Sequence, residues 1–164
     1  MHDKLEKARE ILAEVTPLKT DCGKVCGARC CRSLEGEETG MLLFPGEEAY
    51  YAGKPGWTLR RTASGTLLVC PGSCARDERP LACRIFPLLP VIREGEVKVA
   101  ADQRARAVCP LMKQGIRGMD PAFAEAVREA GKILMEDGAQ RTCMERLTEE
   151  QDELKSLRDR LGGI

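Results

Sequence analysis

The chain has 164 residues, of which 26 are basic, 26 are acidic and 4% are aromatic. A chain of this length fits one domain with its own hydrophobic core, and its balanced charge excludes the strong positive field that would recruit nucleic acid or an anionic membrane. No apolar stretch resembles a secretion signal or reaches the length of a membrane span. We therefore expect a cytoplasmic protein that binds neither nucleic acid nor membrane.

The first half of the chain predicts a helix, an irregular segment and a hairpin. Apolar residues recur at helical spacing within residues 3–15, and Pro17 prevents the helix from continuing. Residues 21–40 are rich in glycine, cysteine and charge, which is typical of irregular backbone. The elements predicted next are a short buried strand at 41–44, a brief helix after Pro45, and a β-hairpin that pairs 57–61 with 66–70.

The second half of the chain predicts a second hairpin and several helical segments. Pro80 can begin a helical turn that holds Cys83, and Pro110 can begin a short helix after Cys109. The remaining elements are a hairpin of 89–93 with 96–100, a helix from Asp120 to about Asp137 closed by Gly138, and a last helix from Thr148 toward Gly162. The last helix has a thin apolar face, so we expect it at the periphery or against a protein partner.

Together these elements predict the α+β class, as a small irregular cysteine-cluster domain with short β-hairpins, flanked by N- and C-terminal helices. We expect a single domain over residues 1–164. Its parts are an N-terminal helix in 1–20, a cysteine-cluster metal-binding core in 21–115 and C-terminal helices in 116–164. Because few aromatic residues are available for packing, bound metal would replace part of the core in the middle of the chain.

Eight of the nine cysteines form one ordered series. Four sulfurs fall within ten residues and four more within the next eighty, a density that packing alone does not require. In a reducing compartment such cysteines hold metal more often than they form disulfides. The candidate metal ligands are Cys22, Cys26, Cys30, Cys31, Cys70, Cys74, Cys83 and Cys109. Cys143 lies outside the series, and we expect it to be a small buried apolar residue.

The sequence around the first four cysteines indicates how they are arranged. Glycine follows both Cys22 and Cys26, and glycine lets the backbone curl so that amide groups face a sulfur. Two glycines also weaken a helix by about 1 kcal/mol each, so we expect a turn here. Side chains of adjacent residues diverge, so Cys30 and Cys31 would serve different metals in two four-thiolate sites. A single four-ligand site with four supporting cysteines is the rival arrangement.

The donor atoms narrow the choice of metal. His2 is the only histidine, so the site would be nearly pure sulfur. Sulfur favours zinc, iron or an iron-sulfur cluster over magnesium and calcium. The arginines within a few positions of a cysteine are Arg29, Arg32, Arg76, Arg79 and Arg84. They would either offset the negative charge of metal-bound thiolates or be ordinary solvated surface residues.

The segment around Cys83 is the most specific motif in the chain. It reads Arg79-Pro80-Leu81-Ala82-Cys83-Arg84-Ile85-Phe86-Pro87-Leu88, and it follows a CxxCxxCC-like opening and the Cys70 and Cys74 pair. With the final Cys109, this order resembles the YkgJ-type cysteine-cluster family over about residues 21 to 112, although the gaps in the opening are three and three rather than two and two. The resemblance implies a zinc- or iron-chelating domain with the same eight ligands. A related segment in flagellin lysine methylases suggests methyl-transfer or redox chemistry in some members.

The sequence favours metal binding over catalysis. It contains no nucleophile elbow, P-loop or dinucleotide fingerprint, so no reaction class is supported by a motif. The first hypothesis is a protein that chelates zinc or iron with its cysteine cluster, in metal handling or as an interaction module with an unidentified protein partner. The second is an iron-sulfur protein that transfers electrons or assists a protein-modifying, methylase-like enzyme. The third is a thiol redox switch with labile disulfides and no tightly held metal.

Overall fold

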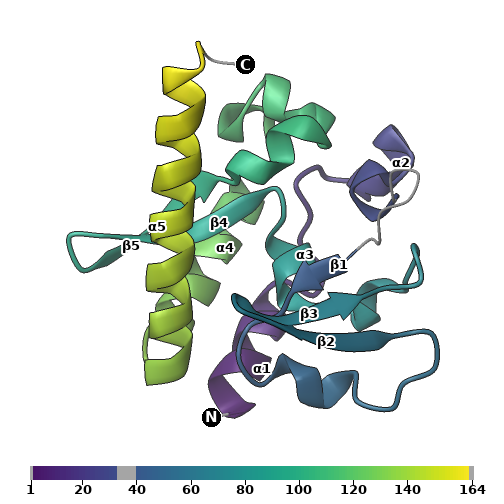
Figure 1. The fold of residues 1–164 in the computed structure, drawn as a ribbon. Helices are drawn as coiled ribbons and strands as arrows, with labels where there is room; N and C mark the ends of the chain where they lie inside the picture. The colour runs from purple at the N-terminus through teal and green to yellow at the C-terminus, as the bar shows by residue number, and fades with distance from the viewer. Residues whose placement is uncertain (1, 33–39, 163–164) are drawn as a thin grey trace.

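The computed structural model describes residues 2–32 and 40–162. It confirms the α+β class, with two small antiparallel sheets and flanking helices (Figure 1). The long helix α5 forms one side of the molecule, and the short helix α2 and the three-stranded sheet lie on the other side. The irregular backbone predicted for 33–39 falls outside the described residues.

Most elements are short. The α-helices are α1 His2–Ile11, α2 Cys22–Cys26, α3 Leu81–Ile85, α4 Pro121–Leu134 and α5 Gly138–Arg160. The strands are β1 Gly40–Leu42, β2 Thr58–Thr62, β3 Gly65–Val69, β4 Leu88–Arg93 and β5 Glu96–Ala101. The 3-10 helices are η1 Arg29–Cys31, η2 Glu47–Tyr50, η3 Arg76–Glu78, η4 Gln103–Ala107, η5 Pro110–Lys113 and η6 Ile116–Gly118. The N-terminal helix is shorter than predicted, since it ends at Ile11 rather than at residue 15.

Both predicted hairpins are confirmed. Strand β3 pairs antiparallel with β2, and β1 pairs with its other edge, so the three-stranded sheet has the order β1-β3-β2. Strands β4 and β5 form the second hairpin, with Arg93 opposite Glu96. Between them Glu94 and Gly95 have positive φ angles of 53° and 78°, the backbone conformation that favours a tight two-residue hairpin turn. Strand β3 ends one residue before Cys70, so its hairpin delivers that cysteine.

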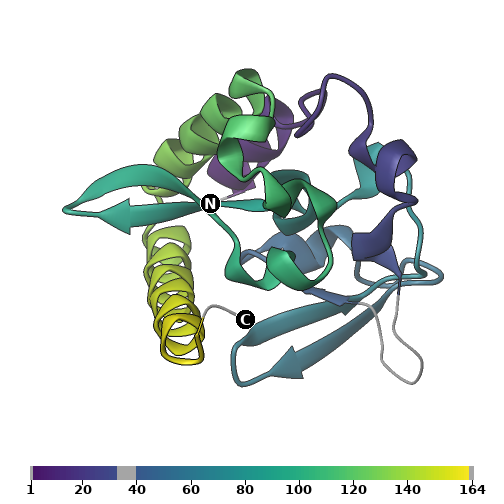
Figure 2. The same cartoon turned by 90° about the horizontal axis from the view of Figure 1, so that it is seen from above.

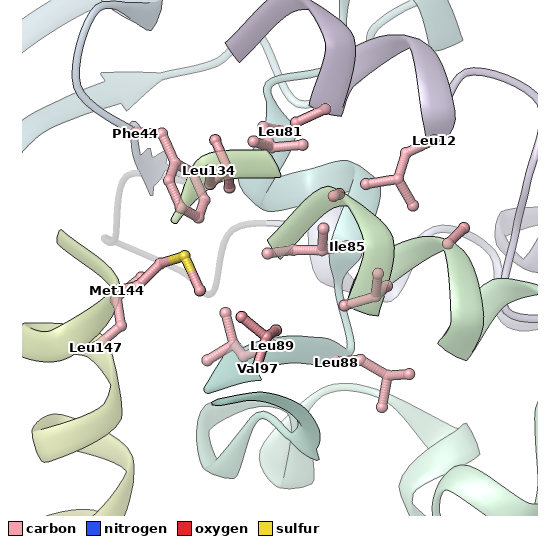
Figure 3. Close-up of a cluster of buried hydrophobic side chains, with 14 of the residues drawn as sticks. Leu12, Phe44, Leu81, Ile85, Leu88, Leu89, Val97, Leu134, Met144 and Leu147 are labelled. Atoms are coloured by element: carbon pink, nitrogen blue, oxygen red, sulfur yellow. The ribbon is translucent and has the colours of Figure 1, made fainter. Parts of the chain in front are cut away.

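The main hydrophobic core lies between the terminal helices and the β4–β5 hairpin (Figure 3). It takes Leu5 from α1, Leu81 from α3 and Phe123 from α4. Helix α5 adds residues that include Met144 and Leu147. The core therefore draws on all three predicted parts of the chain, and α3, which carries Cys83, is anchored in it.

Helix α4 packs directly on the β4–β5 hairpin because Gly131 has no side chain. A Cβ added at Gly131 would lie 2.6 Å from the Cβ of Pro90 and 2.8 Å from the Cγ1 of Val97. Real Cβ atoms do not approach other atoms this closely, so either the helix or the hairpin would have to move. A second, smaller cluster of buried residues consists of Leu43 just after β1, Tyr51 just after η2, and Leu68 in β3.

The two C-terminal helices differ from the prediction. Helix α4 ends at Leu134, and Gly138 begins α5 instead of closing α4. The carboxylate of Asp137 caps α5 by accepting hydrogen bonds from the amides of Ala139 and Gln140. Because an aspartate N-cap stabilises a helix start, the final helix begins well before the predicted start at Thr148.

Thr148 lies in the middle of α5. Its hydroxyl donates a hydrogen bond to the carbonyl of Met144 and accepts one from the amide of Ile92 in β4. The side chain of Gln151 accepts a hydrogen bond from the amide of Gln103. These two residues tie α5 to the hairpin and to η4 rather than forming the predicted capping box. Although α5 has 23 residues, no helix in the described part of the chain is long and apolar enough to cross a membrane.

Candidate metal centre

The cysteines of the series come from four separate parts of the fold. The α2–η1 segment carries Cys22, Cys26, Cys30 and Cys31. The loop after β3 carries Cys70 and Cys74, α3 carries Cys83, and Cys109 directly precedes η5. Figure 2 shows the dark blue α2–η1 segment on the side of the molecule away from α5. None of the nine cysteines, all of which lie in described residues, forms a disulfide.

The segment 22–26 is a short helix, which corrects the predicted turn. The carboxylate of Asp21 accepts a hydrogen bond from the amide of Gly23 and so caps the helix start. Gly27 ends the helix in the left-handed conformation, with φ 66°. Caps at both ends offset the weak helix propensity of glycine. Because the helix is formed, Cys22 and Cys26 lie one turn apart on the same face.

A first group of sulfurs consists of Cys22, Cys26 and Cys109. Burial raises the pKa of Cys22, and the negative charges of Asp21, Cys26 and Cys109 raise it further. Burial also raises the pKa of Cys109, as does the charge of Cys26, while the backbone amide of Leu111 opposes both. Each of these thiols is therefore close enough to a sulfur from the other segment to feel its charge.

A second group of sulfurs consists of Cys31, Cys70, Cys74 and Cys83. Burial raises the pKa of Cys83, and the charges of Cys31, Cys74 and Cys70 raise it further. The pKa of Cys74 is also raised, mainly by burial, with contributions from Cys31 and Cys70. The loop between Cys70 and Cys74 lies beside the first segment, since a Cβ added at Gly72 would be 3.8 Å from the carbonyl oxygen of Cys31, an ordinary contact distance.

Cys30 lies at the border between the two groups. The thiols of these adjacent cysteines influence each other's pKa. Their interaction raises the pKa of Cys30 and lowers the pKa of Cys31 to about 6, so the two thiols titrate as a pair. Cys30 also experiences the charges of Cys83 and Cys22.

The neighbouring arginines have three different roles. Arg79 lies among the sulfurs, where its charge opposes the rise in the pKa of Cys74 and lowers that of Cys31, and it is 3.9 Å from Asp21. Arg76 and Arg84 are neither sulfur partners nor simply solvated, since Arg76 donates to the carbonyls of Ala13 and Val15 and Arg84 donates to those of Arg9, Asp77 and Arg79. Arg29 and Arg32 are exposed at the surface, in line with the solvated alternative.

The sequence did not identify Glu47, which holds the segment before Cys83 in place. Its carboxylate is completely buried and lies 2.6 Å from the guanidinium of Arg9. It also accepts hydrogen bonds from the amides of Leu81, at the start of α3, and Phe44. Burial raises the pKa of Glu47, and the donors that surround it oppose that rise. No local pattern reveals this role, because its partners are far apart in the sequence.

The donor set fits a metal that prefers sulfur. Thiols from different segments of the series influence one another's pKa, and the interaction with Cys30 lowers the pKa of Cys31 to about 6. In residues 2–32 and 40–162, no three histidine, cysteine or carboxylate donors already lie close enough to hold an ion. Cys143, which is not part of the cysteine series, lies on α5, and its side chain is buried in the hydrophobic core, as expected.

No protein-family model matches the chain, and comparisons with curated proteins and with solved structures also found no match.

Proposed function

We propose that this protein binds zinc or iron through the thiolates of Cys22, Cys26, Cys30, Cys31, Cys70, Cys74, Cys83 and Cys109. The observation that carries the proposal is that thiols from four chain segments, none of them in a disulfide, influence one another's pKa, while the ninth cysteine lies apart in the hydrophobic core. Packing alone does not explain this arrangement, because half-buried thiols contribute little apolar burial. Thiolate ligation does explain it, since a metal needs several sulfurs at one point.

The surroundings of the sulfurs support the same proposal. Arg79 places a positive charge beside Cys31 and Cys74, and such a charge would offset the negative charge of a metal bound by thiolates. A zinc ion held only by thiolates would be closed and structural, whereas iron in a cluster would add electron transfer. The resemblance to the YkgJ-type cysteine-cluster family is consistent with chelation of either metal. A reducing cytoplasm is the compartment that suits free thiols.

Elemental analysis of protein purified without oxygen tests the proposal. Zinc or iron at a fixed whole-number ratio to protein, lost when the sulfurs are alkylated under denaturing conditions, would support it. Brown protein with acid-labile sulfide would support the iron-sulfur form, in electron transfer or beside a protein-modifying enzyme. Metal-free protein that takes up neither zinc nor ferrous iron after full reduction would refute metal binding and leave a thiol switch as the better reading.

A further inference from the structure

We infer that the C-terminal end of α5 is a self-association surface, on which a second copy of this chain packs its own α5 in the antiparallel direction. The surface consists of a leucine stripe, Leu154, Leu157 and Leu161, with Glu153 and Arg160 beside it. It contains no cysteine, so its role does not depend on metal binding.

The leucine stripe is exposed along one face of the helix. The exposed fractions of Leu154, Leu157 and Leu161 are 38%, 47% and 61%, and none of the three belongs to the hydrophobic core of the described chain. Their spacing of three and four residues aligns them, because residues three, four and seven apart share one face of an α-helix. Two helices bury a stripe with this spacing against each other in a coiled coil.

The part of α5 that carries the stripe receives little support from the rest of the chain. From residue 152 to the end of the helix, Arg158 is the only residue that is not exposed. Figure 1 shows this yellow end of α5 at the upper edge of the molecule. Helices in proteins gain most of their stability from the packing of an apolar face, so a second copy that covers the stripe would stabilise this end.

The two charges beside the stripe differ from their neighbours on the helix. Asp152, Lys155 and Arg158 each form an ion pair within the chain. Glu153 and Arg160 form no ion pair with any described residue. They are seven residues apart, about 10 Å along the helix axis, which is too far for them to pair with each other. Both charges are therefore available to a second copy.

Antiparallel packing brings these two charges together across the interface. A two-fold axis midway between Leu154 and Leu157 sets each of these leucines opposite the other one on the second helix. In that register Glu153 of each copy lies beside Arg160 of the second copy, so the same contact forms twice. Parallel packing would set each charge level with the same charge of the second copy. The charges therefore favour the antiparallel direction.

Analytical ultracentrifugation in reducing buffer measures the self-association. Because each copy buries only three leucines, we expect a weak, reversible dimer that forms as the concentration rises from micromolar to millimolar. Leu157→Glu places a charge in the middle of the stripe and should leave only monomer, while circular dichroism checks that the variant is folded. Wild-type protein that stays monomeric at the highest concentration would overturn the inference, as would a dimer that persists in Leu157→Glu.

Charge reversals test the antiparallel register. Glu153→Arg sets like charges against Arg160 of the second copy, and Arg160→Glu does the same against Glu153. Each variant alone should therefore associate about tenfold more weakly than the wild type. An equimolar mixture of the two variants again pairs opposite charges at both contacts, so its dimer should regain the affinity of the wild type.

The matched control for these reversals is Lys155→Glu. Lys155 pairs with Asp159 outside the stripe, so this variant should dimerise as the wild type does although its net charge changes as in Arg160→Glu. A mixture of Glu153→Arg and Arg160→Glu that associates no better than either variant alone would rule out the antiparallel register. An equal loss of affinity in Lys155→Glu would show that net charge, rather than the contact between Glu153 and Arg160, sets the affinity.

Discussion

At the scale of single residues, Glu47 is the most deeply buried charged side chain among the described residues. Its side chain is 0% exposed, and Arg9 and two backbone amides surround its carboxylate. Replacing Glu47 by alanine would leave a partly buried guanidinium and the amide of Leu81 without their acceptor. We expect Glu47→Ala to lower the free energy of unfolding by about 3–5 kcal/mol, the usual cost of breaking a buried ion pair. Urea unfolding followed by circular dichroism measures the change.

The control for this variant is Glu10→Ala, on the same helix as Arg9. The side chain of Glu10 is exposed, so its removal should change stability by no more than about 0.5 kcal/mol. Similar losses in both variants would show that the buried ion pair contributes nothing beyond general effects of changing a glutamate.

Tyr51 supplies a pH-dependent contribution to stability. Its ring is 2% exposed, its hydroxyl donates a 2.7 Å hydrogen bond to the carbonyl of Glu78, and burial raises its pKa from 10 to about 12. Because the folded state keeps the phenol protonated, this contribution is complete below pH 10 and is lost as the pH rises to about 12. Tyr51→Phe has no such proton. The difference in free energy of unfolding between the wild type and Tyr51→Phe should therefore shrink by about 1–2 kcal/mol as the pH rises from 10 to 12. Denaturant titrations at several pH values measure it. A difference that stays constant with pH would contradict the role given to the Tyr51 hydroxyl.

At the scale of elements, the close approach of α4 to the β4–β5 hairpin depends on Gly131. Alanine there gains helix propensity of about 1 kcal/mol, but its Cβ would meet Pro90 at 2.6 Å. We expect the clash to prevail, so that Gly131→Ala destabilises the protein by about 1–3 kcal/mol. Gly138→Ala is the matched control, because a Cβ added at the start of α5 has open space around it. The unfolding temperature should fall for Gly131→Ala and should rise or stay unchanged for Gly138→Ala.

Local signals predicted some elements well and misled at others. The two hairpins were predictable because turn-forming residues separate runs that favour strands, and in both cases the partner strand is the next one along the chain. The start of α5 was missed because Gly138 resembles a helix terminator, and Thr148 with Gln151 resembles a helix start. The hydrogen-bond partner of Thr148 is Ile92 and that of Gln151 is Gln103. Both partners are distant in the sequence, so only the folded chain reveals these roles.

At the scale of the whole molecule, the described fold has an apolar core and a cysteine-rich region that lies outside that core. The hydrophobic core gathers 19 buried residues from the terminal helices, α3 and the β4–β5 hairpin, with three from adjoining segments: Leu12, Phe44 and Met119. None of the eight cysteines of the series is among these 19 core residues. The sequence indicated which residues could be metal ligands, since density and order are local properties. It could not group them, since Cys109 and Cys22 meet only through folding.

Under the proposed metal binding, removing the metal should affect the apolar core and the cysteine-rich region differently. A ligand present at about 1,000 times its dissociation constant stabilises a fold by roughly 4 kcal/mol, and the short helices α2 and η1 have no buried side chains of their own to replace that contribution. We expect a strong chelator under reducing conditions to increase amide hydrogen exchange in residues 22–31 and 70–76, while α4 and the first half of α5 keep their protection because their core is apolar. The same chelator added to protein whose cysteines are already alkylated should change nothing. If amide exchange rose equally in α4 and in α2, the metal would support the entire fold and the division into two regions would be wrong. If amide exchange rose in neither helix, the cysteine-rich region would be ordered without metal.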